Sequence, residues 1–387
     1  MSPPAVRFFL SGTGGLSTGG KSGAERAVLS KARNMMAVGK TAGRYNSTRH
    51  YKTLFGAAEG EFSFKAKTPA ELRAWQRAFR ARLVEVLGLD RMAKELSGWK
   101  PKARRVKVED CGDFLREHWT ITTEPTYPLP FYILRLKGKK GALPLVLTPH
   151  GHNTPRMYAG IARDEKELAF MKEGQRDIAV QAAREGYIAI ASTARGFGDT
   201  RTEKDLAQDA ASSCRTQSLH ALLVGRTAIG EKMWDLQRVL DWALENLDVD
   251  PARVAVTGNS SGGTQSLFGA ALDKRIAVAM PSCYFCTFEA SLGSIYHCEC
   301  NYIPGMLRLG EMYDYAGLIA PRPVVMIAGK YDKIFPIKAV REAYKKLRHI
   351  YEVAGAPENC RLAIGPENHR YYADPAWAFA RAQFGTV

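Results

Sequence analysis

The later part of the chain alternates between short runs of apolar residues and longer amphipathic segments. Runs such as YIAIAS at 187–192 and PVVMIA at 323–328 are apolar at successive positions and are bounded by turn residues. A strand that is apolar on both faces is typical of the interior of a parallel sheet, and the intervening segments carry apolar residues at helical spacing. This alternation predicts an α/β fold with a mostly parallel central sheet and helices on both of its faces.

The pattern predicts a sheet of about eight strands. Strand-like runs lie at 104–109, 116–122, 131–136, 144–148, 187–192, 253–257, 276–280, 323–328 and 361–364. Helical spacing occurs at 173–185, at 231–247, from 262 onward, at 338–350 and near 375–384. The first four strand-like runs follow one another closely, so we expect them to pair as antiparallel hairpins. Sheets of this class place their site residues beyond the carboxyl ends of the strands.

The residue pattern changes twice along the chain and suggests three parts. Residues 1–60 form a basic tail with little periodicity, 61–102 a helical extension, and 103–387 the main α/β domain. In the extension, the sequence from Thr68 to Glu71 matches a capping box that begins a helix. The apolar stripe of this helix should pack on the main domain. It consists of Leu72, Trp75, Phe79, Leu83 and Val86.

The net charge of +16 is concentrated at the beginning of the chain. Residues 1–107 contain 22 Lys and Arg against 7 Asp and Glu, whereas the remainder holds 33 basic and 32 acidic residues. A basic surface can bind nucleic acid or another polyanion. Because no nucleic-acid-binding motif accompanies the charge, we interpret it as a solvated arginine-rich helical face and expect no nucleic-acid partner.

The sequence contains no apolar run long enough to span a membrane. The first 35 residues are rich in Gly and Ser and contain one acidic residue, Glu25, a composition shared by organellar transit segments and disordered tails. The apolar run at 6–10 is too short for a secretory signal. We therefore expect a cytoplasmic protein, and the sequence leaves its oligomeric state open.

Four of the seven cysteines cluster in two short motifs. Cys283 and Cys286 are separated by two residues, and Cys298 and Cys300 follow His297. Such a cluster can bind zinc, but a Cys-x-Cys spacing without a second Cys-x-x-Cys is poor for a tetrahedral site. We expect reduced, packed thiols and no metal, with a disulfide as the alternative if the protein is exported.

The sequence VAVTGNSSGG at 254–263 contains a Gly-x-Ser-x-Gly pattern centred on Ser260. A buried strand precedes the pattern and a helix begins after it. In that context the pattern is typical of a sharp turn that holds its serine in strained backbone geometry at the positive end of a helix. The pentapeptide alone is common. Ser260 is therefore a candidate nucleophile only if a histidine and an acid follow at later strand ends.

A nucleophilic serine needs a general base that removes its proton. Only His297, His349 and His369 follow Ser260 in the chain. His349 lies in a helical run and is typical of a surface histidine, and His297 lies among the cysteines. His369 lies in a turn-rich loop directly after the strand at 361–364, which makes it the favoured base.

The histidine in turn needs a carboxylate that orients it. Asp332 follows the apolar strand at 323–328, whereas the reserve candidate Asp314 precedes that strand. Ser260, Asp332 and His369 thus each follow a strand of their own. They stand in the chain order Ser, Asp, His, which is the order of α/β-hydrolases.

Attack on a carbonyl carbon also needs donors for the oxyanion that forms. One donor should be the backbone N–H of Ser261, next to the nucleophile. The other should come from the loop PHGHN after the strand at 144–148, where we favour the N–H of His152, with Gly151 as the reserve. The alternative is that His150 and His152 are simple turn residues or a metal-binding pair.

These motifs together resemble a known superfamily. HGHN, RGFGDT, GNSSGG, LIAPRPVVMIAGKYDKIFP and the late histidine are similar to the α/β-hydrolases over residues 60–387. Within them, the chain resembles the acetylxylan-esterase and dienelactone-hydrolase-like branch, and HCECNYIPG resembles the bacterial acetylxylan esterases. Two departures limit the transfer: dienelactone hydrolases carry Cys in place of Ser260, and the acetylesterases usually carry Gln after the serine.

The resemblance implies a cofactor-independent serine carboxylic-ester hydrolase that removes a short acyl group from a carbohydrate or a similar small-molecule alcohol. An insert at 283–318 could cap the pocket, with Tyr284, Phe285 and Tyr302 binding substrate; ordinary packing of these aromatics is the alternative. The competing functions are a prolyl-oligopeptidase-like serine peptidase, whose large propeller domain residues 1–100 cannot supply, and a non-catalytic binding protein of the same fold.

Overall fold

The computed structural model describes residues 46–385 of the 387-residue chain. Clustering of backbone contacts divides the chain into two compact units, Met1–Gly56 and Ala57–Val387. The described part of the first unit contains one helix, α2 (Ser47–Gly56), in a stretch where the sequence showed little periodicity. The transit-like composition of residues 1–35 lies outside the described residues.

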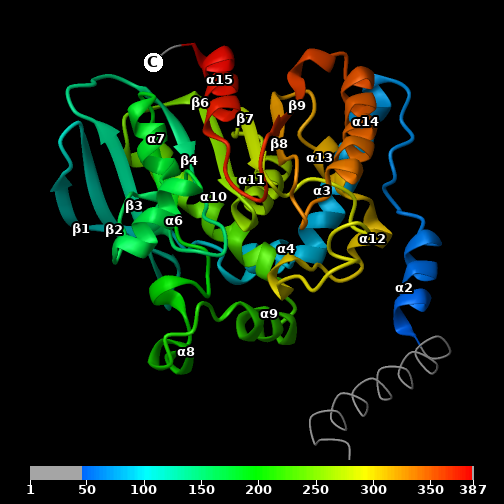
Figure 1. Ribbon diagram of the computed structural model, residues 1–387, viewed down its shortest axis with the longest axis horizontal. Helices are drawn as coiled ribbons and strands as arrows, with labels where there is room; N and C mark the ends of the chain where they lie inside the picture. Colours follow the sequence, from blue (N-terminus) through cyan, green and yellow to red (C-terminus); the bar gives the residue numbers. More distant parts are fainter. Residues whose placement is uncertain (1–45, 386–387) are drawn as a thin grey trace, which may run out of the picture. The chain divides into compact units, whose positions relative to one another are not determined.

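The second unit is built on a single nine-stranded sheet, close to the size predicted (Figure 1). The strands lie in the order β1-β2-β3-β5-β4-β6-β7-β8-β9. Their bounds are β1 (Lys102–Asp110), β2 (Phe114–Glu124), β3 (Tyr127–Leu136), β4 (Leu143–Leu147), β5 (Ile188–Ser192), β6 (Val249–Asn259), β7 (Val278–Ser282), β8 (Val324–Gly329) and β9 (Cys360–Gly365). From β5 to β9 the neighbouring strands are parallel, whereas β1, β2, β3 and β5 pair antiparallel. This is the predicted α/β architecture.

The predicted hairpin pairing was wrong for β4. This strand lies between β5 and β6 and runs parallel to both, while β3 pairs with β5. The reason is its composition: LPLVL is apolar on both faces and is almost wholly buried in the interior of the sheet. The carboxyl end of β4 therefore lies at the same sheet edge as those of β5 to β9, where the sequence predicts the site.

Helices cover both faces of the sheet (Figure 1). Alternate strand residues separate the two cores, since Leu145 and Leu147 belong to one apolar cluster and Val146 to the other. The first cluster includes residues of α3, α4, α10, α11, α12, α13 and α14, and the second those of α5, α7 and α15. The bounds are α3 (Pro69–Leu87), α4 (Leu89–Glu95), α5 (Pro155–Tyr158), α6 (Glu165–Glu173), α7 (Ile178–Arg184), α8 (Glu203–Ala207), α9 (Cys214–Leu223), α10 (Ala228–Asn246), α11 (Ser261–Leu272), α12 (Met306–Leu309), α13 (Met312–Gly317), α14 (Ile337–Val353) and α15 (Ala373–Phe384).

The helix expected at 173–185 is interrupted. α6 ends at Glu173 and α7 begins at Ile178, and between them Gln175 adopts a positive φ of 50°. A left-handed residue cannot continue a right-handed helix, so the chain turns before α7 packs on the sheet.

α3 begins where the capping box predicts. The Thr68 hydroxyl accepts the N–H of Glu71 at 3.2 Å, and the Glu71 carboxylate accepts the N–H of Thr68 at 3.2 Å. Phe79 and Leu83 on its apolar stripe are fully buried in the first core cluster. The helical extension therefore packs within the same compact unit as the sheet.

Polar contacts also fix α3 on the sheet unit. The Gln76 amide donates hydrogen bonds to the carbonyl oxygens of Gly317 and Ala320, at 3.0 and 2.7 Å. Arg80 donates to the carbonyl oxygen of Leu318 at 2.8 Å. These side chains bind carbonyl groups in the last residue of α13 and in the segment that follows it.

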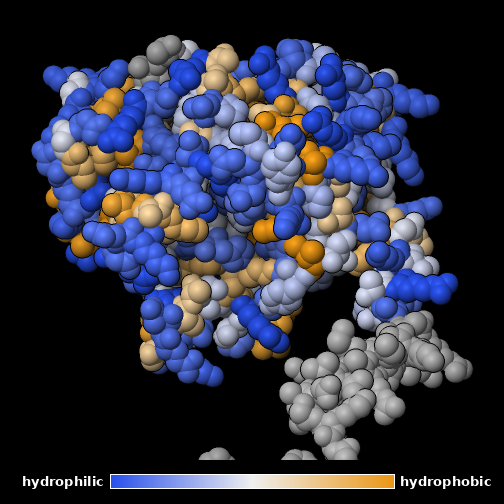
Figure 2. All heavy atoms as spheres, in the orientation of Figure 1, coloured by the Kyte–Doolittle hydropathy of each residue, from blue (hydrophilic) through white to orange (hydrophobic). Residues whose placement is uncertain are grey.

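Among residues 46–385, no helix combines the length and apolarity needed to cross a membrane. Figure 2 shows hydrophilic residues over most of the visible face, with hydrophobic residues in small groups between them.

Candidate active site

Ser260 occupies a sharp turn between β6 and α11. Its backbone angles are φ 60° and ψ −120°, a region that residues other than glycine rarely adopt. Its N–H donates to the carbonyl oxygen of Ser282 at the end of β7, 2.9 Å away. Because α11 begins at Ser261, the Ser260 hydroxyl lies at the positive end of that helix. The strand, strained turn and helix are the arrangement that the sequence motif predicts.

Two glycines allow the loop after β4 to pass directly over this turn. A Cβ atom on either Gly258 or Gly262 would overlap the carbonyl oxygen of Pro149. A side chain at either position would therefore push away the loop that carries Gly151 and His152. The glycines of the motif are explained by this close approach of backbone to backbone.

Asp332 and His369 form a hydrogen-bonded pair beyond the ends of β8 and β9. His369 Nδ1 lies 2.7 Å from Asp332 Oδ2. The other carboxylate oxygen accepts the N–H groups of Ile334 and Phe335, at 2.8 and 3.1 Å. The carboxylate is fully buried, whereas 22% of the His369 side chain is exposed. An ionised carboxylate can only accept, so the pair places the imidazole proton on Nδ1 and leaves Nε2 able to accept one.

The loops that carry this pair are packed against each other. The N–H of Tyr331 donates to the carbonyl oxygen of Glu367 at 2.8 Å. Gly329 lies so close to the backbone of Asn368 that a Cβ atom there would overlap the Asn368 carbonyl oxygen. The position of His369 is therefore set by backbone contacts as well as by the carboxylate.

The pair lies beside the Ser260 turn, with the end of β7 between them. Cys283 follows Ser282, the residue that holds the Ser260 N–H. The Cys283 sulfur, a carboxylate oxygen of Asp332 and a ring nitrogen of His369 all lie within 4.8 Å of one another. The structure thus brings the three predicted residues to one edge of the sheet, although no hydrogen bond joins Ser260 to His369 among the described contacts.

The reserve acid Asp314 lies elsewhere. Its two carboxylate oxygens accept the N–H groups of Phe64 and Glu311, at 3.1 and 2.8 Å, and it caps α13. Burial raises its pKa to about 6. Its hydrogen bonds are those of a structural residue, and Asp332 is the acid that contacts His369.

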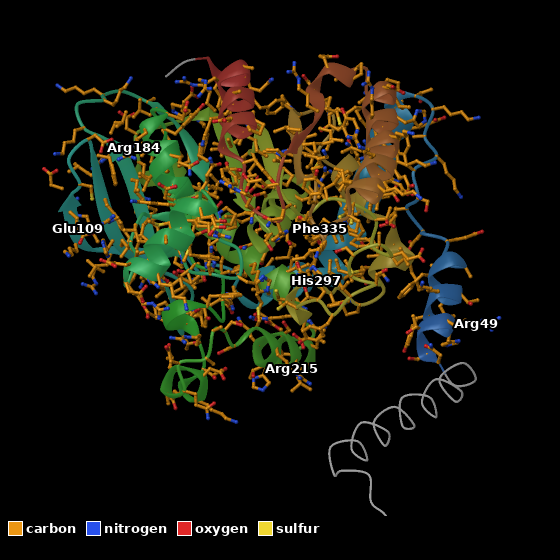
Figure 3. The ribbon with its side chains drawn as sticks, viewed as in Figure 1. Arg49, Glu109, Arg184, Arg215, His297 and Phe335 are labelled. Atoms are coloured by element: carbon orange, nitrogen blue, oxygen red, sulfur yellow. The ribbon has the colours of Figure 1, made fainter. Side chains whose placement is uncertain are left out.

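The other two histidines differ in their relation to the site. His349 lies on α14 with 62% of its side chain exposed, near Glu352. His297 packs edge-on against Phe335, with ring centroids 5.8 Å apart (Figure 3). Phe335 in turn stacks on His369, with ring centroids 5.9 Å apart. The Nε2 atom of His297 is buried and has no hydrogen-bond partner among the described residues. His297 is thus a neighbour of the site, separated from His369 by one aromatic ring.

The loop after β4 reaches the nucleophile turn at Gly151. A Cβ atom on this glycine would lie 3.6 Å from the Cβ atom of Ser260 and 2.8 Å from the carbonyl oxygen of Asn259. The hydroxyl of Tyr158, which sequence reasoning did not identify, accepts the N–H of Asn259 at 3.1 Å and supports the turn from below. The candidate oxyanion residues Gly151, His152 and Ser261 are therefore adjacent to Ser260 in space.

His150 fixes this loop to the end of β5. The ring is fully buried; Nδ1 donates to the carbonyl oxygen of Gly151 at 2.7 Å, and Nε2 accepts the N–H of Ala194 at 2.9 Å. Burial lowers the pKa of His150 to about 3, so the ring is neutral at physiological pH. Both of its nitrogens are used in structural bonds, which gives the residue a positioning role.

The motif RGFGDT begins with a buried arginine. Arg195 donates to the Asp235 carboxylate at 2.6 and 2.7 Å and lies 2.6 Å from Glu124 and 3.5 Å from Glu231. Burial opposes its charge, but these carboxylates more than offset that effect and raise the pKa of Arg195. The network joins the loop after β5 to β2 and α10, and thereby supports the backbone that His150 contacts.

The aromatic residues proposed to bind substrate lie in different environments. Tyr284 and Phe285 are 1% and 2% exposed and belong to the first apolar core cluster. Their burial favours the packing alternative. Tyr302 is 42% exposed, and its hydroxyl donates to the carbonyl oxygen of Leu292 at 3.0 Å. Of the three, only Tyr302 presents a surface that a ligand could reach.

A polar cavity of about 640 Å³ opens beside the loop of His152. It is bounded by that loop, by α6 and by the segment around α8. Charged and polar side chains dominate its wall, including Asn153, Arg156, Arg163, Glu167, Asp199, Arg201 and Asp209. Its volume lies within the range of small-molecule sites, and its wall is more polar than is usual for them.

Sequence comparison agrees with this geometry. The sequence profile described as "Abhydrolase family" matches residues 30–379. The chain belongs to the Abhydrolase family. This places it in the α/β-hydrolases, with a structure named as an acetyl xylan esterase among its structural neighbours, as the motifs predicted.

Individual relatives of this Abhydrolase family member are distant. "Putative hydrolase YtaP" of Bacillus subtilis (strain 168) is 26% identical over 292 residues, which span 73% of this chain and 91% of the relative. A crystal structure titled as a "putative acetyl xylan esterase" of Bacteroides fragilis is 19% identical, with a TM-score of 0.67 over 86% of this chain and 84% of its own. A glucuronoyl esterase from Solibacter usitatus is 15% identical, with a TM-score of 0.55 over 74% of this chain and 86% of its own. At these identities the solved structures establish the fold.

Proposed function

We propose that this protein is a serine carboxylic-ester hydrolase with Ser260 as nucleophile, His369 as general base and Asp332 as the residue that orients His369. The observation that carries the proposal is the strained turn at Ser260, placed beside an imidazole whose Nδ1 is held by a buried carboxylate 2.7 Å away. A serine in an ordinary turn would need neither the backbone strain nor the oriented base.

In the proposed reaction, Nε2 of His369 takes the hydroxyl proton of Ser260 as its oxygen attacks the ester carbonyl carbon. The backbone N–H groups of Ser261 and His152, with Gly151 in reserve, would hold the oxyanion that forms. The imidazolium then gives the proton to the leaving alcohol, and an acyl-serine remains. Water repeats the same steps on the acyl-serine and releases the carboxylic acid. A hydrogen bond between Ser260 and His369 would form when substrate is bound, since catalytic hydrogen bonds are often long or unmade in the unliganded enzyme.

For the substrate, we propose a short acyl ester, such as acetate, on a carbohydrate. The polar cavity beside His152 is large enough for a sugar unit. Tyr302 does not line this cavity and belongs to a separate hollow with Leu222 and Pro304, so we do not include it among the residues proposed to bind the sugar. Structural relatives titled as acetyl xylan esterase and glucuronoyl esterase support a carbohydrate ester.

The test is hydrolysis of p-nitrophenyl acetate by the full-length protein and by Ser260→Ala. We expect Ser260→Ala to lose at least 10³-fold in kcat/KM, since the nucleophile is removed. Ser266→Ala is the matched control, because Ser266 lies on the same helix and its hydroxyl bonds only the carbonyl oxygen of Gly262. Equal rates for the protein and Ser260→Ala would contradict the proposal. Release of acetate from acetylated xylan, compared with methanol from a methyl uronate ester and with a peptide panel, would identify the substrate class.

A further inference from the structure

A second group of reactive side chains lies next to the proposed site and takes no part in its chemistry. His152, Cys214, Cys298 and Cys300 come from the loop after β4, the start of α9 and the segment 298–301. Their ligand atoms, one ring nitrogen and three sulfurs, all lie within 4.8 Å of one another. In the sequence, Cys298 and Cys300 lie near Cys283 and Cys286, but the fold separates these two pairs. Cys214 and His152 join the pair Cys298 and Cys300.

The spacing of these atoms fits a tetrahedral metal site. With Zn–N near 2.05 Å and Zn–S near 2.3 Å, a tetrahedral ion separates a nitrogen ligand from a sulfur ligand by about 3.6 Å and two sulfurs by about 3.8 Å. His152 Nε2 lies 3.6 Å from Cys300 Sγ. Three cysteines and one histidine are a common ligand set of structural zinc sites. The poor Cys-x-Cys spacing is therefore not decisive, since only two of the four ligands are close in sequence.

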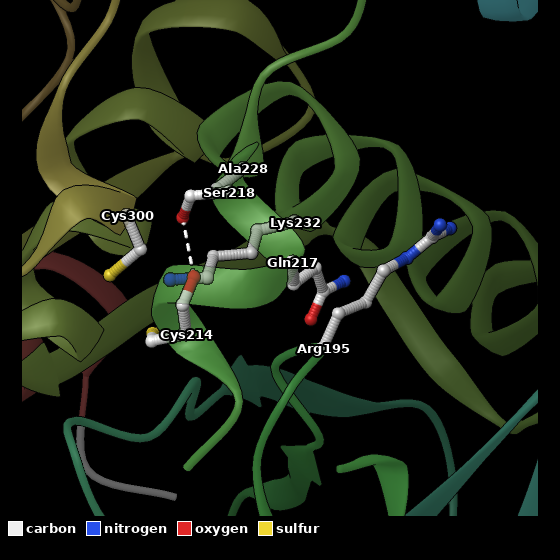
Figure 4. A pocket seen from close by; sticks show the side chains of 7 residues that line it. All are labelled: Arg195, Cys214, Gln217, Ser218, Ala228, Lys232 and Cys300. Carbon is white, nitrogen blue, oxygen red and sulfur yellow. Dashed lines mark hydrogen bonds between the residues drawn. The ribbon is translucent and has the colours of Figure 1, made fainter. Parts of the chain in front are cut away.

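A buried lysine beside the cluster supplies an independent observation. Lys232 on α10 is only 4% exposed, and among the described residues no carboxylate forms an ion pair with it. Its ammonium lies 3.4 Å from the Ser261 hydroxyl, and its side chain lines the same narrow crevice as Cys214 and Cys300 (Figure 4). A buried cation without a counter-charge is strongly unfavourable.

A zinc ion in this cluster would supply that counter-charge. Zn²⁺ with three thiolates and one neutral imidazole carries a net charge of −1, which balances the +1 of Lys232. Three neutral thiols would leave the ammonium uncompensated. The side-chain amide of Asn301 also donates toward Cys300 Sγ at 3.7 Å. Donors of this kind around metal-bound sulfur are the outer contacts that such sites need.

We propose that His152, Cys214, Cys298 and Cys300 bind one structural zinc ion, with Lys232 balancing its charge. Binding converts three thiols to thiolates and releases their protons to solvent, with no change of oxidation state. All four coordination positions come from the protein, so the site is closed and has no position for a substrate or a reactive water. The ion would join the loop after β4 to α9 and to the segment 298–301. If the proposed function holds, it would also fix the loop whose His152 N–H faces the oxyanion.

The first test is the metal content of the full-length protein, expressed with zinc in the medium and purified under reducing conditions without chelator. We expect about one zinc per chain by inductively coupled plasma mass spectrometry. Cobalt substituted for zinc should give the visible absorption of a tetrahedral thiolate site. Absence of bound metal after incubation with equimolar zinc would overturn the proposal. So would a disulfide between two of the cluster cysteines in the freshly reduced, native protein.

Variants separate this site from general thiol binding. Cys214→Ser and Cys300→Ser should each lose most of the zinc and the cobalt spectrum, whereas Cys111→Ser and Cys360→Ser, which alter cysteines outside the cluster, should keep both. Retention of stoichiometric metal by Cys214→Ser would overturn the assignment. The measurement on the unaltered chain remains decisive if a variant fails to fold. Ser260→Ala should retain its zinc, so failure of the esterase proposal and failure of this one give different results.

Discussion

Replacing Asp332 by Asn tests the proposed chemistry with almost no change of shape. In the structure, Oδ1 accepts two backbone N–H groups and Oδ2 faces His369 Nδ1 at 2.7 Å. The asparagine oxygen can keep the two backbone bonds, which leaves its NH₂ group facing the imidazole. Because that group is a donor, Nδ1 must become an acceptor and the proton moves to Nε2. His369 would then have no atom able to receive the Ser260 proton.

The expected cost follows from this change of tautomer. Serine hydrolases in which the orienting acid is converted to its amide lose about 10⁴-fold in kcat, and each tenfold loss corresponds to about 1.4 kcal/mol of barrier. We therefore expect Asp332→Asn to lower kcat for p-nitrophenyl acetate by about 10³- to 10⁴-fold, or about 4 to 5 kcal/mol. KM should change little, because the acid does not contact substrate.

Asp314→Asn is the matched control. Asp314 is equally buried and contacts no imidazole. Each of its two oxygens accepts one backbone N–H, so Asp314→Asn loses one of these bonds and controls for the loss of a buried carboxylate. This variant should keep kcat within a few-fold of the unaltered enzyme, and circular dichroism should show that both variants fold. If Asp332→Asn retained full activity, or if Asp314→Asn lost as much, the assignment of Asp332 would be refuted.

Two further predictions concern the frame of the site. Gly262→Ala places a methyl group against the Pro149 carbonyl oxygen, so it should displace the loop of Gly151, lower kcat at least tenfold and reduce the melting temperature. The control is Gly56→Ala, whose methyl group would meet nothing within 4 Å and should change neither kcat nor the melting temperature. If Gly262→Ala left both quantities unchanged, the close approach of the loop would be contradicted. Burial lowers the pKa of His150 to about 3, against about 6.5 when unfolded, so between these values the unfolded chain binds a proton that the folded chain does not. Acidification from pH 7 to 5 should thus remove about 2 kcal/mol of stability through this residue, measured by urea unfolding. His150→Gln should lack that contribution, and an identical pH dependence in the variant would show that His150 is not the cause.

The parts of the structure that were predictable from sequence are those encoded locally. Five consecutive residues specify the turn at Ser260, and four consecutive residues specify the helix cap at Thr68. The strand before Asp332 is predictable because it is apolar on both faces, and β9 before His369 is predictable from its short apolar run and the turn residues that follow. The order in which strands lie side by side is not local, and the position of β4 between β5 and β6 had to come from the structure.

The environment of individual side chains was harder to predict for a related reason. Tyr284 and Phe285 are aromatic side chains, which occur both at binding surfaces and in apolar cores. Only their burial in the structure distinguishes these two roles. Cys214 and Lys232 gave no signal as site neighbours, because they meet Cys300 from helices more than 60 residues away in the chain. Convergence of distant segments leaves no spacing that a motif search could detect.

The packing of α3 limits how far this enzyme can be shortened. Phe79 and Leu83 fill the same apolar core that backs the strands of the site, and Gln76 and Arg80 donate to backbone carbonyls at and just after the end of α13. A recombinant version that started near residue 100 would keep every proposed reactive group, but the apolar core residues that α3 covers would be exposed to water. We expect such a truncation to be recovered as aggregate, so the smallest autonomous unit begins upstream of the cap at Thr68.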